Sequence, residues 1–182
     1  MKRLFLSIFL IFTLLSCQKT YLEKMKGKKQ ERKIVSIISS KNQTANSHPL
    51  HLFDQDSKSI WVASNDKSGV GESIEITLDH DIILNRLGIT PSPNSKKIKR
   101  LLIVCNSDKA SYDKTIHFNR SEKEQIIPFI KTFKAKRITI YIQDIYKDKS
   151  LPNETGLSGI SLYHNSEQVI FTNVAEILKQ KK

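Results

Sequence analysis

The stretch RITIYIQ (residues 137–143) decides the fold class, because polar and apolar side chains alternate along it one by one. A period of two is typical of a β-strand with one buried face, which here carries Ile138, Ile140 and Ile142. The stretch SIEITL (residues 73–78) alternates in the same way. Both segments therefore predict half-buried strands.

Working outward from these two stretches, the rest of the chain also indicates β-structure. Pro128 interrupts an otherwise strand-like run, so that run is expected to be bent or to lie at a sheet edge. Short strands separated by Gly, Pro and Asn predict an all-β sandwich or barrel. The further strands are expected at 34–38, 82–90, 99–105, 114–118, 125–133 and 157–163, with 169–171 as a short last strand, a turn near 49–55 and a C-terminal tail at 173–182 that could form a short helix.

The N-terminus has the pattern of a secretory signal peptide. Met1-Lys2-Arg3 is followed by apolar residues 4–15, Ser16 and Cys17, and this order is typical of a cleaved leader. The apolar run is shorter than the roughly 20 residues of a membrane-spanning helix. LLSC (residues 14–17) resembles the lipobox of bacterial lipoproteins, which implies cleavage after Ser16 and a diacylglycerol on Cys17. An uncleaved anchor, or an ordinary leader with a chance cysteine, is the alternative.

These features predict four parts: a leader (1–16), a lipidated N-terminus with a basic tether (17–33), one folded domain (34–172) and the tail (173–182). We expect an exported protein anchored in the bacterial envelope. Gln18 is not the aspartate that retains some lipoproteins in the inner membrane, which favours the outer membrane by analogy.

The net charge of +12, or +10 without Lys2 and Arg3, favours anionic partners. Such partners include phospholipid headgroups and acidic host or matrix polymers. The alternative is that the lysines only keep the protein soluble. No nucleic-acid partner is expected.

The segment 52–62 combines carboxylates, hydroxyls and the only tryptophan, which makes it the most distinctive local pattern in the sequence. Asp54 and Asp56 could supply oxygen ligands to Ca²⁺, or they could accept backbone N–H bonds in a turn. Trp61 is either a core anchor or a sugar-stacking platform, and its apolar neighbours favour the core. Cys105 ends an apolar run and is expected to pack as a small apolar side chain.

No catalytic motif is present. The five histidines lack the H-E-x-x-H spacing, no G-x-S-x-G occurs, and Gly69-Val70-Gly71 lacks the third glycine of a dinucleotide loop. We therefore expect neither an enzyme nor a cofactor.

Four segments carry a family resemblance. LFDQD…SIWV (52–62) and GVGESIEI (69–76) resemble the opening of discoidin-type, galactose-binding-like domains, in particular the NADase-type glycan-binding branch. RITIYI (137–142) and TGLSGISLY (155–163) are similar to the discoidin ending. The resemblance covers roughly residues 34–163 and implies a jelly-roll β-sandwich that binds ligands without catalysis.

Three residues depart from the family pattern. Gln55 and Lys147 stand where glycine is usual, and Gly159 replaces a common acidic residue. These departures leave the fold inference intact and weaken any inherited ligand or metal site.

The resemblance also implies a ligand site in the loops at the ends of the sandwich, where function sits on a rigid scaffold. The expected function is glycan or ligand binding at the envelope. The alternative is a structural or assembly protein of the envelope without a free glycan ligand. The candidate ligand-binding residues are Asn65, Asp66, Lys67, Asn94, Lys96, Tyr112, Tyr146, Lys147 and Asn153.

Overall fold

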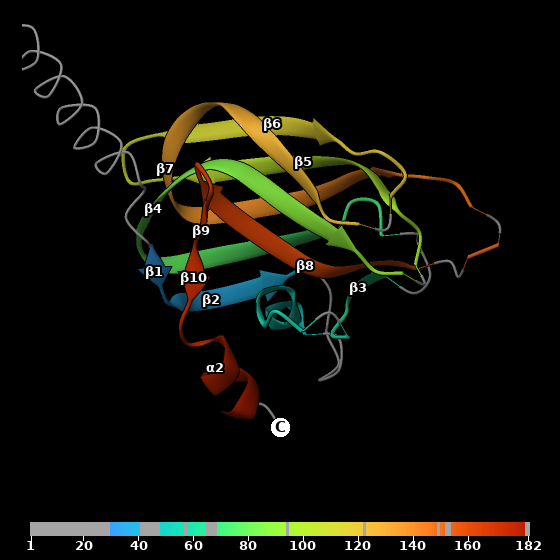
Figure 1. The fold of residues 1–182 in the computed structure, drawn as a ribbon, viewed down its shortest axis with the longest axis horizontal. Coiled ribbons are helices and arrows are strands. Elements are labelled where there is room, and N and C mark those ends of the chain that lie inside the picture. Colours follow the sequence, from blue (N-terminus) through green and yellow to red (C-terminus); the bar gives the residue numbers. More distant parts are fainter. Residues whose placement is uncertain are drawn as a thin grey trace, which may run out of the picture.

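Two long strands, β4 (Ser73–Pro91) and β7 (Gln125–Ile145), run side by side through the computed structural model and bend at the same end (Figure 1). The structure describes residues 30–40, 48–56, 58–64, 69–93, 95–121, 123–148, 150–151 and 154–180.

The bend follows from unequal numbers of residues on the two strands. Thr77 lies opposite Arg137 and Ile82 lies opposite Ala135, so four residues of β4 face one residue of β7. Extra residues on one strand bend a β-ladder. As a result, the first half of β4 pairs with the second half of β7, and the second half of β4 pairs with the first half of β7.

The bend folds the sheet into the two layers of a β-sandwich. The first layer contains β2 (Ile34–Ser39), the first half of β4, the second half of β7, β5 (Ile98–Asn106) and β6 (Ser111–His117). The second layer contains β3 (Trp61–Ser64), β8 (Thr155–His164), the second half of β4 and the first half of β7. The sequence predicted each long strand as two strands, which matches their division between the layers.

The core lies between the layers. Ile138, Ile140 and Ile142 are all buried, as their alternation predicted. Trp61 is only 1% exposed, which confirms the core interpretation. Cys105 is buried with a free thiol, and burial raises its pKa to about 12.

Pro128 lies on a sheet edge, as predicted. Within the described part of the chain, the first half of β7 pairs only with β4, and Pro128 lies opposite Arg86 next to an irregularity in the register. A proline is tolerated there because no second strand requires its missing N–H.

Within the described residues, the chain already contacts the sandwich at Gln30, four residues before the predicted domain start at residue 34. The Gln30 amide bonds both backbone groups of Ile83 at 2.7 Å, and the Arg32 guanidinium donates to the Asp81 carbonyl. The tether prediction rested on charge and missed these contacts. Cys17 and the leader lie outside the described residues.

The remaining elements close the sides of the sandwich. They are β1 (Glu31–Arg32), which pairs with β10 (Ile170–Phe171), β9 (Glu167–Gln168), which pairs with β8, the 3₁₀ helix η2 (Pro49–Phe53) and the C-terminal helix α2 (Val174–Gln180). No helix in the described ranges is long and apolar enough to cross a membrane.

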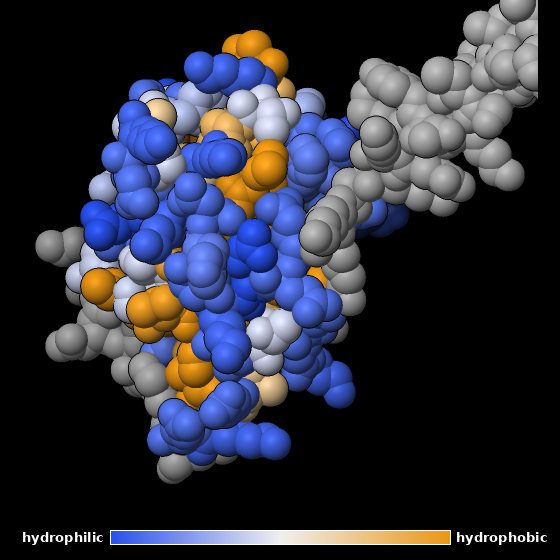
Figure 2. All heavy atoms as spheres, turned by 90° about the vertical axis from the view of Figure 1, so that its left-hand side faces the viewer, coloured by the Kyte–Doolittle hydropathy of each residue, from blue (hydrophilic) through white to orange (hydrophobic). Residues whose placement is uncertain are grey.

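The surface at the bend is mixed. Figure 2 views the molecule from this end and shows apolar patches within a mainly hydrophilic surface, including patches at the height of β6 and β7.

We expect Gly69→Ala to destabilise the fold more than Gly71→Ala. Both glycines have positive φ, 76° and 90°, which costs an L-residue about 1–2 kcal/mol. A Cβ on Gly69 would also lie 2.9 Å from Ala63 Cβ and 3.1 Å from Thr155 Cβ, whereas the position at Gly71 is open. Overpacking adds about 1–3 kcal/mol. Urea denaturation of both variants measures the difference, and equal losses would contradict this packing.

Candidate functional site

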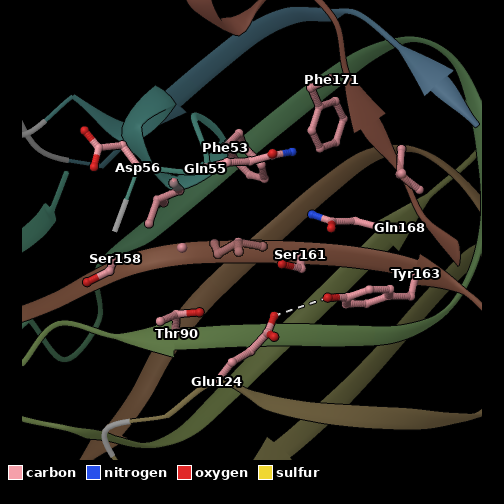
Figure 3. Close-up of a pocket in the computed structure, with 14 residues that line it drawn as sticks. Phe53, Gln55, Asp56, Thr90, Glu124, Ser158, Ser161, Tyr163, Gln168 and Phe171 are labelled. Atoms are coloured by element: carbon pink, nitrogen blue, oxygen red, sulfur yellow. Dashed lines mark hydrogen bonds between the residues drawn. The ribbon is translucent and has the colours of Figure 1, made fainter. Parts of the chain in front are cut away.

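A groove of about 330 Å³ runs along β8, between the turn after η2 and the strands β9 and β10 (Figure 3). It is more polar than a second hollow of similar volume in the described structure. Its walls are formed by Leu52, Phe53, Gln55, Asp56, Thr90, Glu124, Ser158, Gly159, Ile160, Ser161, Tyr163, Gln168, Val169 and Phe171.

At some positions on the floor of the groove, small residues project little or no side chain above the sheet. Along β4 and β8, the pair Leu87–Leu162 is buried in the core, and the next pair, Gly88–Ser161, faces the opposite way because side chains alternate. The following outward pair is Thr90–Gly159. Glycine at two of these four positions leaves room above the sheet.

Glu124 occupies the room above Gly88. A Cβ on Gly88 would lie 2.4 Å from Glu124 Oε1, and the same oxygen is 3.4 Å from the Tyr163 hydroxyl. Burial, together with the nearby Glu124 carboxylate, raises the pKa of Tyr163. Because the Tyr163 hydroxyl donates to Glu124, the pair presents a ligand with oxygen atoms that accept hydrogen bonds.

Two amides lie on the opposite wall. Figure 3 shows the side chains of Gln55 and Gln168 directed into the space beside β8. Phe53 and Phe171 meet edge to face behind them, with ring centroids 5.1 Å apart. Gln55 has φ 60°, the left-handed conformation that favours glycine, so glycine in the family pattern suits this position.

Ser158 contributes an unpaired hydroxyl to the groove wall. The residue is 8% exposed, and its Oγ is the only buried hydroxyl in the described ranges without a hydrogen-bond partner. A buried hydroxyl of this kind has lost its hydrogen bonds to water without gaining a partner in the protein, which destabilises the folded state.

The groove can hydrogen-bond a polyhydroxylated ligand. It combines carboxylate, amide and hydroxyl groups with aromatic rings, which are the groups that recognise sugars. Its acidic wall residues are Asp56 and Glu124, and its described lining includes no lysine or arginine. The charge therefore favours neutral or cationic ligands over acidic ones.

Comparison with known proteins assigns the family. The model of the NAD glycohydrolase translocation F5/8 type C domain matches residues 23–163. The chain belongs to this family. No curated protein sequence matches it.

Solved structures similar to this F5/8 type C domain show the same discoidin-like β-sandwich. The structure of the CBM32-1 and CBM32-2 domains of Clostridium perfringens ZmpB aligns over 72% of the chain, with 14% identity and a TM-score of 0.59, and the chain spans 34% of it. The family 32 module of C. perfringens NanJ, solved in complex with galactose, aligns over 73% of this chain and 99% of its own, with 10% identity and a TM-score of 0.58. A chitosan-binding module from Paenibacillus sp. IK-5 aligns over 71% and 93%, with 16% identity and a TM-score of 0.55.

In this F5/8 type C domain, three predicted ligand residues meet at the end opposite the bend. Tyr146 N donates to Lys97 O, and Lys96 N donates to Glu154 O, which brings Lys96, Tyr146 and Lys147 together. The Tyr146 hydroxyl donates to Phe118 O at 2.8 Å, so it already has a structural partner.

The structure does not bring the other described candidate to this end. On β5, Cys105 lies opposite Tyr112 and Ile98 lies opposite Ile145, a separation of seven residues, or about 23 Å. Tyr112 instead stacks on Phe133, with centroids 4.4 Å apart. Asn65, Asp66, Lys67, Asn94 and Asn153 lie outside the described residues.

The two candidate calcium ligands accept backbone N–H bonds, as the turn interpretation expects. Asp54 Oδ1 accepts the Asp56 N–H and Asp56 Oδ1 accepts the Lys58 N–H, both at 2.9 Å. Asp54 Oδ2 also lies 2.8 Å from His51 Nδ1. Within the described ranges, no three His, Cys, Asp or Glu side chains are grouped so that they could hold a metal ion.

Sequence reasoning missed Glu124, Ser161, Tyr163 and Gln168 as groove residues. Gly159 was the one feature of the sequence that could have indicated the groove. A glycine in place of a common acidic residue, at an outward position of a strand, leaves a depression in the surface of the sheet.

We expect Ser158→Ala to stabilise the protein and Ser95→Ala to destabilise it. Removing a buried unpaired hydroxyl relieves a desolvation cost of about 1–3 kcal/mol. Ser95 is also buried, but its hydroxyl lies within hydrogen-bond distance of Ser92 O and Gly156 O. Thermal and urea unfolding of both variants measure the effect, and a loss of stability in Ser158→Ala would show that its hydroxyl is satisfied.

Proposed function

We propose that the protein is an exported lipoprotein whose β-sandwich binds a neutral or amino sugar in the β8 groove and catalyses no reaction. The observation that carries this proposal is the grouping of Glu124, Tyr163, Gln55 and Gln168 around one low floor. These groups supply directional donors and acceptors in a hollow with aromatic walls.

Two further observations support glycan binding. The chain has the same fold as modules solved with galactose and with GalNAc-containing sugars, although identities of 10–13% establish the fold alone. The F5/8 type C match covers most of the domain. Neither observation selects the sugar, so the groove chemistry carries that part of the proposal.

The anchor is proposed from the leader sequence. A lipid on Cys17 would hold the domain at the bacterial envelope, with the outer membrane favoured by the residue at position 18. Two or three acyl chains give stable attachment.

A glycan array with the folded protein tests the binding function, followed by calorimetry on the best ligand. We expect Glu124→Gln to weaken binding about tenfold or more, because a hydrogen bond to a charged group contributes about 1.5–3 kcal/mol and 1.4 kcal/mol is tenfold. Gln168→Ala should weaken binding by a smaller factor, about two- to tenfold, because a hydrogen bond between neutral groups contributes about 0.5–1.5 kcal/mol. Lys147→Ala, an exposed change outside the groove lining, is the control and should leave the affinity unchanged.

The groove assignment fails if a bound glycan is lost with Lys147→Ala but kept with both groove variants. Absence of any glycan signal above a basic control protein of equal charge would overturn glycan binding itself.

An assembly role is the alternative, and β2 favours it. This strand pairs only with β4 within the described structure and exposes Val35 and Ile38 by 65% and 59%. Apolar side chains on an edge strand are typical contact points for a partner. If assembly is the main role, mild crosslinking of cells should recover envelope partners with the native chain and lose them with Val35→Asp/Ile38→Asp.

A further inference from the structure

The segment FIKTFKAKR (residues 129–137), which forms the bend of β7, has an unusual combination of side chains. It carries four cationic groups and no acidic one. Arg137 approaches Glu75 at 3.6 Å, whereas Lys131 and Lys134 are exposed and take part in no ion pair found in the described ranges. The bend therefore presents a local excess of positive charge.

Aromatic rings lie beneath these lysines. Tyr112 of β6 stacks on Phe133, and Phe129 packs against the same ring at 5.1 Å. Lys131 Nζ lies 5.6 Å from the Tyr112 ring centroid. A hollow of about 330 Å³ opens here, lined by aromatic and aliphatic atoms and by Lys109, Lys131 and Lys134.

One large apolar side chain projects from the same segment. Ile130 is 90% exposed, the most exposed large hydrophobic residue in the described structure. An isoleucine in this position gains nothing from the fold of its own chain. Beside lysines, it has the character of a residue that enters the headgroup region of a bilayer.

The N-terminal end of the domain lies beside this surface. Gln30, the first described residue, bonds both backbone groups of Ile83, and Ile83 lies opposite Lys134 in the β4–β7 ladder. Cys17 precedes Gln30 by 13 residues, which span at most about 45 Å when fully extended. A lipid on Cys17 would keep this end of the domain close to the membrane.

We propose that the β7 bend is a membrane-contact surface that rests on anionic phospholipid headgroups. Lys131 and Lys134 supply the charge complementarity, Ile130 supplies the apolar contact, and the attachment point lies at the same end. Asp79 and Asp81 in the paired bend of β4, and Asp108 and Asp113 on the neighbouring hairpin, reduce the local charge without lying in the segment itself. A soluble acidic polymer could form ion pairs with the lysines but would not bury the apolar Ile130 side chain, whereas a lipid surface can do both. The lipid surface is therefore favoured.

The consequence is an oriented domain. With the bend on the membrane, the β8 groove lies along the side of the sandwich, and the end that carries Lys96 and Lys147 points away from the bilayer (Figure 1). The orientation rests on the lipid anchor of the proposed function, but it does not depend on glycan binding.

A single fluorescent label tests this contact. The Ile130→Cys protein, lipidated and reconstituted into vesicles, would carry an environment-sensitive thiol dye. Cys105 will not compete because it is buried and its pKa is raised to about 12, and the Cys17 sulfur carries lipid. The matched control is Lys147→Cys, an exposed position at the opposite end.

In vesicles containing phosphatidylglycerol we expect blue-shifted emission and strong quenching by brominated lipid at position 130, and neither at position 147. The contact should weaken in phosphatidylcholine vesicles, with Lys131→Gln/Lys134→Gln, and in 1 M salt, where the Debye length falls from about 10 Å at 0.1 M to about 3 Å. Equal signals at 130 and 147 would overturn the proposal.

Two controls separate this proposal from others. Vesicle flotation of the reconstituted protein reports the anchor, so failure to float would refute the lipoprotein proposal, whereas flotation without a signal at 130 would refute only the membrane contact. A response of the label to a soluble sulfated polysaccharide, with none to vesicles, would assign the surface to acidic polymers and overturn the membrane assignment.

Discussion

The paired bend of β4 and β7 is the constraint on which the rest of the structure depends. Because four residues of β4 face one residue of β7 between Thr77 and Ile82, both strands turn together and each enters both layers. The core then fills the space between two halves of the same ladder. The second half of β4 supplies part of the groove floor, and the turning part of β7 presents the basic segment. One irregularity in register thus fixes the core and shapes two separate surfaces.

The strands could be predicted from the sequence because polar and apolar side chains alternate along any strand that buries only one of its faces. Ile138, Ile140 and Ile142 are adjacent in the pattern and adjacent on the buried face, so a local signal was sufficient. The groove gave no comparable signal. Glu124 reaches it from the position just before β7, Ser161 from β8 and Gln168 from β9, and their proximity depends on pairings between distant segments.

The same distinction explains the errors at the chain ends and in the loops. Residues 30–33 are rich in polar and basic side chains, so composition placed them in the tether, yet Gln30 and Arg32 bond backbone groups of β4. Tyr112 was a candidate ligand residue because aromatic residues suit sugar sites. The hairpin geometry of β5 and β6 places it at the end opposite Tyr146, where it packs on Phe133. Composition gives a residue's chemistry but not which end of a strand it occupies.

The charge of the protein is divided between surfaces with different chemistry. The groove has carboxylates and no lining lysine or arginine in the described structure, while the β7 bend has four cations and no acid. A net charge of +12 would by itself suggest acidic ligands, but the groove carboxylates would repel them. The positive charge is therefore better matched to an anionic surface, such as the membrane proposed above, than to a ligand in the groove. Since the two surfaces share no residue, contact at one leaves the other open, and a membrane-bound domain would retain its full capacity for sugar.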